Sequence, residues 1–357
     1  MEIKKELLPA DQRKPKPTDE NALGFGRIFS DHMFVMDYHE GRGWHDARIV
    51  PYGPFSLDPA ALVLHYGQEV FEGLKAYRGA DGGIYMFRPQ ANAKRMQRSC
   101  ARLCMAQVPE EDFLEAIYEL VRVERDWIPS SPGTSLYVRP TMIATEAALG
   151  VKISDEYLFY VIVGPVGAYY PEGFNPTKIY VEEKYVRAAP GGTGEAKTAG
   201  NYAASLLAFH EAHQKGYTQV LWLDACDRQG IEEVGTSNMF FVIGDEVITA
   251  PLNGTILPGV TRDSVLKLCE HWGIKAVERR ITIDEVLAAQ ADGSLKEAFG
   301  SGTAAVISPV GSFAYKGKEY QVGDGGVGEI SRRLYDEIIG IQLGQKPDPF
   351  GWVVKVA

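Results

Sequence analysis

The stretch that decides the fold and the chemistry of this chain reads Gly191-Gly192-Thr193-Gly194-Glu195-Ala196-Lys197-Thr198-Ala199-Gly200-Asn201-Tyr202. It places one lysine, Lys197, between two glycine-rich turns. The residues of 178–186 predict a strand before it, and the apolar spacing of 202–215 predicts a helix after it, closed by Gly216. A lysine held between a strand and a helix requires a chemical explanation.

Two chemical explanations compete for Lys197. It could form a Schiff base with an aldehyde cofactor, or it could bind phosphate in a nucleotide-binding loop. Residues 191–198 depart from the phosphate-loop pattern at Ala196, where glycine is required, although 220–224 resembles the apolar strand that ends in a magnesium-binding acid. Alanine adopts the backbone angles of that loop only at a cost, which weakens this alternative but leaves it open. An ordinary solvated lysine is the third interpretation.

The second half of the chain contains candidates for the other parts of a Schiff-base site. Such a site needs an acid at the cofactor's pyridine nitrogen and a clamp for its phosphate. Residues 233–238 place a carboxylate at a tight turn before a strand. Residues 257–262 open a helix, whose first amides and dipole favour an anion, and 300–304 form a second turn with hydroxyls and amides. The Schiff-base interpretation therefore explains more of the sequence.

Composition and charge limit the class of protein. The 357 residues carry a formal net charge of -10, which disfavours nucleic-acid binding because that binding relies on Lys and Arg. No apolar run approaches the length of about 20 residues that spans a bilayer, and the N-terminus has no apolar signal-peptide core. From these two observations we expect no membrane partner and a cytoplasmic location. The four cysteines lack metal-ligand spacing, so we expect no metal.

The order of expected elements predicts a mixed α/β (α+β) fold with two domains. A smaller N-terminal α/β domain spans 1–170, a Gly/Pro-dense segment forms an interdomain linker at 171–184, and a larger C-terminal domain with the lysine spans 185–357. Further strands and helices follow from periodicity. The expected strands are 28–38, 47–51, 84–87, 135–144, 157–163, 218–223, 239–243 and 246–249, and the expected helices are 91–103, 110–126 and 262–272.

An ordered set of motifs identifies the chain as similar to a known family. The motifs are Leu64-His65-Tyr66, Val70-Phe71-Glu72-Gly73-Leu74-Lys75-Ala76, Arg88-Pro89, Arg95-Met96, Ser135-Leu136-Tyr137-Val138-Arg139-Pro140, Gly164-Pro165-Val166-Gly167-Ala168-Tyr169, Lys197, Gly200-Asn201-Tyr202, 233–238, 257–262 and 300–304. With these motifs the chain resembles, from about Gly24 to the C-terminus, the branched-chain amino acid aminotransferases, which are fold type IV enzymes related to D-amino acid aminotransferase.

The resemblance implies an activity and a cofactor, pyridoxal 5'-phosphate. The enzyme would transfer the amino group of leucine, isoleucine or valine to 2-oxoglutarate by a ping-pong mechanism. Lys197 would bind the cofactor aldehyde and shuttle the proton, Glu233 would pair with the pyridine nitrogen, and Tyr202 would donate to the phenolate oxygen. The phosphate would be held by Arg95, the amides of Val260 and Thr261, and the Thr303 hydroxyl, with Thr236 nearby.

The resemblance also implies a substrate pocket and an assembly. An aromatic wall, completed in a homodimer by the neighbouring subunit, would be built from Phe25, Tyr66, Phe71, Tyr137 and Tyr169. The Tyr137 hydroxyl and Arg139 would receive the γ-carboxylate of glutamate, and the amides of the Thr303-Ala304 turn would receive the α-carboxylate. The partners would thus be small molecules: branched-chain amino acids, their 2-oxo acids, glutamate and 2-oxoglutarate.

Several alternatives stay open at this stage. A D-amino acid aminotransferase and an aminodeoxychorismate lyase share the lysine and the glutamate, and a structural role would leave both residues unexplained. One departure from the family pattern lies at Ala305-Val306-Ile307-Ser308, where some members have a Cys-x-x-Cys pair. We therefore expect that thiol switch to be absent.

Overall fold

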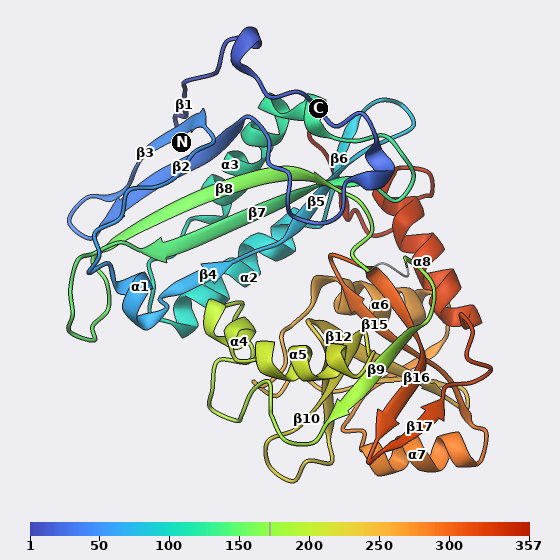
Figure 1. The fold of residues 1–357 in the computed structure, drawn as a ribbon. Helices are drawn as coiled ribbons and strands as arrows, with labels where there is room; N and C mark the ends of the chain where they lie inside the picture. The colour runs from blue at the N-terminus through green and yellow to red at the C-terminus, as the bar shows by residue number, and fades with distance from the viewer. Residues whose placement is uncertain (171–172) are drawn as a thin grey trace. The chain divides into compact units, whose positions relative to one another are not determined.

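The computed structural model describes residues 1–170 and 173–357, and these divide into two compact units. The first unit comprises Met1–Tyr169, Ala196–Ala199 and Gly340–Ala357, and the second comprises Tyr170–Glu195 and Gly200–Ile339. Each unit is built on a nine-stranded sheet, so the predicted mixed α/β class is confirmed (Figure 1). No helix in the described parts of the chain is long and apolar enough to cross a bilayer.

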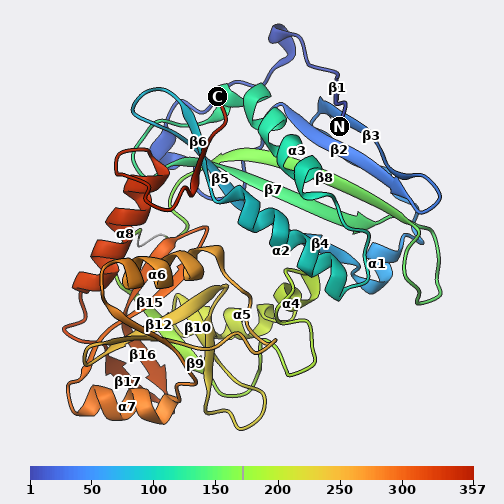
Figure 2. The same cartoon turned by 180° about the vertical axis from the view of Figure 1, so that it is seen from behind.

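The sheet of the first unit is mainly antiparallel, in the order β1-β3-β2-β8-β7-β5-β6-β18, with β4 paired to β7. Two long helices, α2 and α3, lie along one face of this sheet (Figure 2). The elements of this unit are β1 Lys4–Lys5, β2 His32–His39, β3 Gly43–Pro51, α1 Leu62–Tyr66, β4 Glu69–Phe71, β5 Leu74–Arg78, β6 Ile84–Phe87, α2 Pro89–Arg102, α3 Glu110–Val123, β7 Ser135–Ala144, β8 Glu156–Val166 and β18 Val353–Lys355.

The position of α3 follows directly from its sequence. Glu110, Glu111 and Asp112 lie in its first turn, where negative charge complements the helix dipole. Its buried residues repeat at helical spacing from Phe113 to Val121, which gives one apolar stripe. That stripe packs into the same core as alternate residues of β7 and β8, among them Val138 and Phe159. The intervening residues of β7 therefore point to the opposite face of the sheet.

The second unit contains a closed ring of strands. The sheet order is β11-β10-β9-β16-β15-β12-β13-β14 with β17 on β16, and an additional pairing of β11 with β12 closes the ring. The elements of this unit are β9 Thr177–Glu182, α5 Leu206–Gln214, β10 Gln219–Leu223, β11 Ile231–Val234, β12 Ser237–Ile243, β13 Glu246–Thr249, α6 Val260–His271, β14 Lys275–Glu278, α7 Ile283–Ala291, β15 Leu295–Gly302, β16 Val306–Tyr315 and β17 Lys318–Gln321. The division between the units falls within α4 (Ala199–Ala203) and α8 (Glu329–Gln342).

The compact units differ from the predicted domain boundaries in three places. Residues 177–182 of the expected linker form β9, which confirms the strand expected at 178–186 and is paired on both sides, with β10 and β16. The first two linker residues, 171 and 172, lie outside the described residues. The lysine segment, Ala196–Ala199, belongs to the first unit. The C-terminal residues also return to the first unit, because β18 pairs with β6. Strand pairing, which local composition does not reveal, decides all three.

The helix expected at 202–215 is interrupted. It is replaced by the short α4 and by α5, with a turn between them at 204–205. The Ser205 hydroxyl donates to the Tyr202 carbonyl at 2.7 Å, a local bond of the kind that competes with the helix ladder. Gly216 follows the C-terminus of α5 with φ +83°, as expected for a closing glycine.

Candidate active site

The backbone of Lys197 is fixed by β4 and α2 of the first unit. Its N–H donates to the Ser99 hydroxyl of α2 at 2.9 Å, and its carbonyl accepts from the Phe71 N–H of β4 at 3.0 Å. The next residue, Thr198, pairs with Val70 in an isolated β-bridge. The predicted catalytic lysine is therefore held from both sides by regular structure.

The side chain of Lys197 lies over an aromatic ring in a positively charged neighbourhood. Its Nζ is 4.7 Å from the centroid of the Phe71 ring. Burial, followed by the charge of Arg95, lowers the pKa of Lys197 to about 8, while the carboxylate of Glu72 opposes this shift and Arg139 adds to it. A lysine with that pKa has a far larger unprotonated, nucleophilic fraction near neutral pH than an ordinary lysine.

Arg95 is buried and paired with a buried glutamate. Its Nε and Nη2 donate to the two carboxylate oxygens of Glu72 at 2.7 and 2.8 Å, and Asn92 Nδ2 donates to the same carboxylate at 2.8 Å. Burial on its own would raise the pKa of Glu72, but Arg95 lowers it below its usual value. The structure thus gives the predicted phosphate ligand a fixed orientation, through a partner that the sequence analysis did not consider.

Four of the five predicted wall residues are brought together in the first unit. The Phe25 ring packs edge-on against Tyr137 and Tyr169, with centroids 5.0 and 4.9 Å apart. The Arg139 guanidinium lies 5.2 Å from the Tyr137 ring and 4.8 Å from the Phe71 ring, and its Nη2 donates to the Tyr137 hydroxyl at 3.1 Å. An apolar wall and two polar groups therefore occupy the same region.

The fifth predicted wall residue, Tyr66, has other neighbours among the described residues. It ends α1, is 39% exposed, and its hydroxyl donates to the Leu149 carbonyl. Its ring neighbour is His65, at 6.1 Å. The structure therefore does not bring Tyr66 into contact with the other predicted wall residues.

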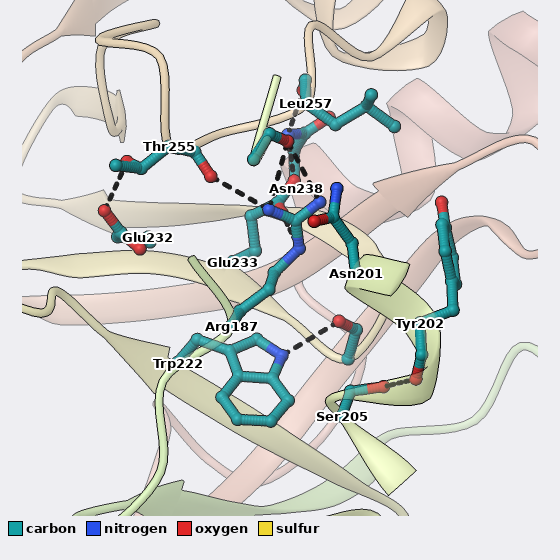
Figure 3. A network of polar contacts seen from close by, with 12 residues as sticks. Arg187, Asn201, Tyr202, Ser205, Trp222, Glu232, Glu233, Asn238, Thr255 and Leu257 are labelled. Atoms are coloured by element: carbon teal, nitrogen blue, oxygen red, sulfur yellow. Dashed lines mark hydrogen bonds and ion pairs between the residues drawn. The ribbon is translucent and has the colours of Figure 1, made fainter. Parts of the chain in front are cut away.

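The second unit positions Glu233 through a network of buried polar groups (Figure 3). Glu233 lies on β11 and is 2% exposed. Asn238, its cross-strand neighbour on β12, donates to Glu233 Oε1 at 2.9 Å and also to the Leu257 carbonyl at 2.9 Å. Arg187 Nε contacts Glu233 Oε2 at 2.5 Å. The predicted partner of the pyridine nitrogen is thus a carboxylate held by an amide and a guanidinium.

Sequence reasoning missed Arg187. Besides its ion pair with Glu233, its two Nη atoms donate to backbone carbonyls, Nη1 to Thr255 at 2.8 Å and both to Gly194 at 3.3 Å. Its signal was a lone arginine among small and apolar residues just before the glycine-rich turn, where a buried cation needs an anionic partner.

The remaining predicted cofactor residues of the second unit lie at helix and turn positions. Tyr202 lies on α4, and Thr236 is exposed in the turn between β11 and β12. Val260 and Thr261 begin α6, where the N-cap is Gly259, a residue with no side chain to bind the first amides. Helix N-termini of this kind suit a phosphate group.

The predicted α-carboxylate turn shows backbone strain. Thr303 and Ala304 lie between β15 and β16. The first residue of β16, Val306, has φ +62° and is 3% exposed. A β-branched residue is unusual in the left-handed region, and such strain concentrates at functional sites.

Comparison with known proteins decides the family. The model of class IV aminotransferases matches residues 69–313. The chain belongs to this family. Its relatives include branched-chain-amino-acid aminotransferase 2 of Bacillus subtilis, 55% identical over 97% of this chain and 95% of the relative, and branched-chain-amino-acid transaminase 1 of the same organism, 56% identical over 96% of each chain. The predicted resemblance is confirmed.

Solved structures of the family confirm the predicted fold. The branched-chain amino acid aminotransferase of Escherichia coli matches with a TM-score of 0.75 and 28% identity, over 92% of this chain and 99% of that one. The branched-chain aminotransferase of the thermophilic archaeon Thermoproteus uzoniensis, solved with norvaline, matches with a TM-score of 0.76 and 26% identity, over 91% and 100% of the two chains. A further branched-chain amino acid aminotransferase, solved with pyridoxamine 5'-phosphate, matches with a TM-score of 0.75 and 28% identity, over 90% and 98%. The fold is that of the fold type IV aminotransferases.

The nucleotide-loop alternative finds no support in this class IV aminotransferase. The acid expected to bind magnesium, Asp224, closes a turn after β10: its carboxylate accepts from the backbone N–H groups of Cys226, Asp227 and Gly230 at 2.8, 3.1 and 2.5 Å. Those bonds give Asp224 a structural role.

Proposed function

We propose that this chain is a branched-chain amino acid aminotransferase that uses pyridoxal 5'-phosphate and transfers the amino group of leucine, isoleucine or valine to 2-oxoglutarate. Relatives of that name are 52–56% identical over nearly the whole chain. The observation in the structure that carries the proposal is Lys197, an amine with a pKa of about 8 on a backbone fixed by Ser99 and Phe71.

The residues present fit the chemistry of that cofactor. Its aldehyde needs an unprotonated amine, which Lys197 supplies. Its ring nitrogen needs a carboxylate, which Glu233 supplies, held by Arg187 and Asn238. Its phosphate needs amides and a cation; we assign these to the N-terminus of α6 with Val260 and Thr261, to Thr303 and to Arg95, with Thr236 nearby.

Bound pyridoxal phosphate supplies an electron sink that stabilises negative charge at the substrate Cα. Lys197 Nζ removes and returns the proton at that carbon, a role that its lowered pKa permits near neutral pH. Tyr202 is assigned to the cofactor's phenolic oxygen. The ping-pong order follows because one pocket serves both half-reactions, so the branched 2-oxo acid must leave before 2-oxoglutarate can bind.

Substrate selection rests on the cluster of Phe25, Phe71, Tyr137, Arg139 and Tyr169. The aromatic rings suit an aliphatic side chain. The Tyr137 hydroxyl and the Arg139 guanidinium, 3.1 Å apart, supply a donor and a charge for the γ-carboxylate of glutamate. We assign the α-carboxylate to the amides of Thr303 and Ala304.

We also propose that the enzyme is a cytoplasmic homodimer. The support for the dimer is a set of large apolar side chains on the first unit with exposed fractions of 39–81%, on α1 and on the segment that contacts it: Leu64, Tyr66, Leu149, Val151 and Ile153. Exposed patches of large apolar residues mark interaction sites. Burial of this patch by a second copy would also explain Tyr66, which we expect to join a substrate pocket only in the dimer.

Substrate profiling tests the proposal against its relatives within the fold. We expect transfer from L-leucine, L-isoleucine and L-valine to 2-oxoglutarate, with far lower rates for D-alanine and no lyase activity on aminodeoxychorismate. The Lys197→Ala variant should fold but lose steady turnover. Preference for a D-amino acid, or wild-type turnover of Lys197→Ala, would contradict the proposal.

A further inference from the structure

Two adjacent glutamates of β11 are both buried but have different surroundings. Glu232 is 5% exposed and Glu233 is 2% exposed. Successive side chains of a strand point to opposite faces, so the two carboxyl groups meet different neighbours. Glu233 contacts Arg187 and Asn238, whereas Glu232 contacts the hydroxyl of Thr255 (Figure 3). The proposed function gives no role to Glu232.

The contacts of the Thr255 hydroxyl bear on the protonation state of Glu232. This hydroxyl lies within hydrogen-bond distance of two oxygens, Glu232 Oε1 and, at 2.7 Å, Asn253 Oδ1. The Thr255 N–H also donates to Asn253 Oδ1 at 3.3 Å, which identifies that atom as the amide oxygen. One hydroxyl proton serves only one acceptor. With Thr255 donating to Asn253, a hydrogen bond between the Thr255 hydroxyl and Glu232 carries its proton on Glu232.

The rest of the Glu232 environment favours the neutral acid. Its Oε2 is buried and has no hydrogen-bond partner within the described parts of the chain. An anionic oxygen in that position would be costly, whereas the carbonyl oxygen of a neutral acid costs much less. Burial raises the pKa of Glu232 above its usual value; the hydrogen bond with Thr255 opposes that effect, the charge of Asp224 adds to it, and Arg187 opposes it.

A continuous path of contacts leads from Glu232 to Glu233. Glu232 holds the Thr255 side chain, the Thr255 carbonyl accepts from Arg187 Nη1 at 2.8 Å, and Arg187 Nε contacts Glu233 Oε2 at 2.5 Å. The backbone around Thr255 is closely packed, since a Cβ added to Gly194 would lie 2.3 Å from the Thr255 carbonyl oxygen. We propose that Glu232 is held as the neutral acid and that, through Thr255 and Arg187, it positions the Glu233 carboxylate.

The protonation state is tested on the cofactor-free protein, independently of the proposed function. Glu232→Gln replaces the neutral acid by a neutral amide that can also donate to Thr255. A glutamate carboxyl group of the unfolded chain ionises near pH 4.3. If Glu232 stays neutral in the folded protein, the free energy of unfolding therefore falls as the pH rises above that value. The melting temperature of Glu232→Gln should therefore rise relative to wild type between pH 5 and pH 7. A difference that stays constant over this range would overturn the neutral-acid assignment.

The positioning role is tested by the affinity for pyridoxal phosphate and by the pH midpoint of the bound cofactor's visible band. This test rests on the proposed role of Glu233. Glu232→Met, which has no donor, should weaken cofactor binding about tenfold and shift the midpoint, whereas Glu232→Gln should change neither. Thr255→Val removes the same link and keeps the carbonyl, so it serves if Glu232→Met does not fold.

Two results would overturn the positioning role. One is a cofactor affinity of Glu232→Gln as low as that of Glu232→Met. The other is wild-type cofactor affinity and midpoint in both Glu232→Met and Thr255→Val. A Glu233→Gln variant with unchanged cofactor affinity and midpoint would instead contradict the assignment of Glu233, so the two failures are distinguishable.

Discussion

Gly73 controls the position of the Tyr137 hydroxyl, and the smallest possible side chain at Gly73 should disturb it. A Cβ built at Gly73 lies 2.2 Å from the Tyr137 hydroxyl oxygen and 3.0 Å from Cζ. Ordinary van der Waals contact begins near 3.4 Å. The Gly73→Ala variant therefore requires the hydroxyl to move by about 1.2 Å, away from its place 3.1 Å from Arg139 Nη2.

The expected cost of that movement is large for catalysis. A displacement of about 1 Å within an active site can cost about 100-fold in rate. We expect kcat/KM for L-leucine with 2-oxoglutarate to fall by about 10- to 100-fold in Gly73→Ala, measured by coupled detection of glutamate. Because Tyr137 and Arg139 are assigned to the γ-carboxylate, KM for 2-oxoglutarate should rise more than KM for leucine.

Two control variants separate the clash with the Tyr137 hydroxyl from a general effect of replacing glycine by alanine. A Cβ built at Gly53 of the same unit meets no atom of the described residues within 4 Å, so Gly53→Ala should keep the wild-type kcat/KM. In the Tyr137→Phe background the closest clashing atom is gone, so adding Gly73→Ala should cost much less than it does in wild type. A kcat/KM of Gly73→Ala within about twofold of wild type would show that Gly73 does not control the position of the Tyr137 hydroxyl.

Three further predictions concern the buried charges and the α6 turn. Glu72→Gln leaves the Arg95 guanidinium without its anion and should lower the free energy of unfolding by about 3–5 kcal/mol in urea titrations; an unchanged value would contradict the pair's role. Because the folded-state pKa of Glu72 is lowered from 4.5, its stabilisation is present above that pH and is lost on acidification, so the difference between Glu72→Gln and wild type should shrink below pH 4.5. In competitive acylation of the cofactor-free protein, Lys197 should show a midpoint near pH 8, and a midpoint near 10.5 would argue against its environment. Gly259→Ala places a Cβ 2.0 Å from Asn238 Oδ1, so the Asn238 side chain that holds Glu233 must move. Binding of pyridoxal phosphate, measured by equilibrium titration, should weaken about tenfold. Wild-type affinity would show that the position of the Asn238 side chain is not needed.

The spacing of apolar residues predicted the helices and strands that depend only on their own sequence. The apolar stripe of α3 and the alternation of β7 gave their positions closely, and the strand 135–144 is β7 in the structure. The glycine-rich loop identified Lys197 because few other roles place a lysine there. These features depend on residues close together in the sequence.

The sequence could not reveal features that depend on distant partners. The strand expected at 178–186 is present as β9, but most of it was placed in a linker because the preceding Gly/Pro-dense segment resembles a boundary; its pairing with β10 and β16 leaves no mark on its composition. Arg187 looked unremarkable until its distance to Glu233 was known. Tyr66 is grouped with the wall by family position alone, and its expected neighbours would belong to a second copy of the chain.

Reductive trapping shows which lysine carries the cofactor, and we expect it to be Lys197. The purified protein is incubated with pyridoxal phosphate, its near-visible spectrum is recorded with and without leucine, and it is then reduced with borohydride for peptide mapping. Burial also lowers the pKa of Lys75 to about 8, so this lysine is an internal control for simple reactivity. We predict a visible band that shifts on addition of leucine and a label confined to Lys197. A colourless protein, or a label on Lys75 with none on Lys197, would show that Lys197 does not carry the cofactor.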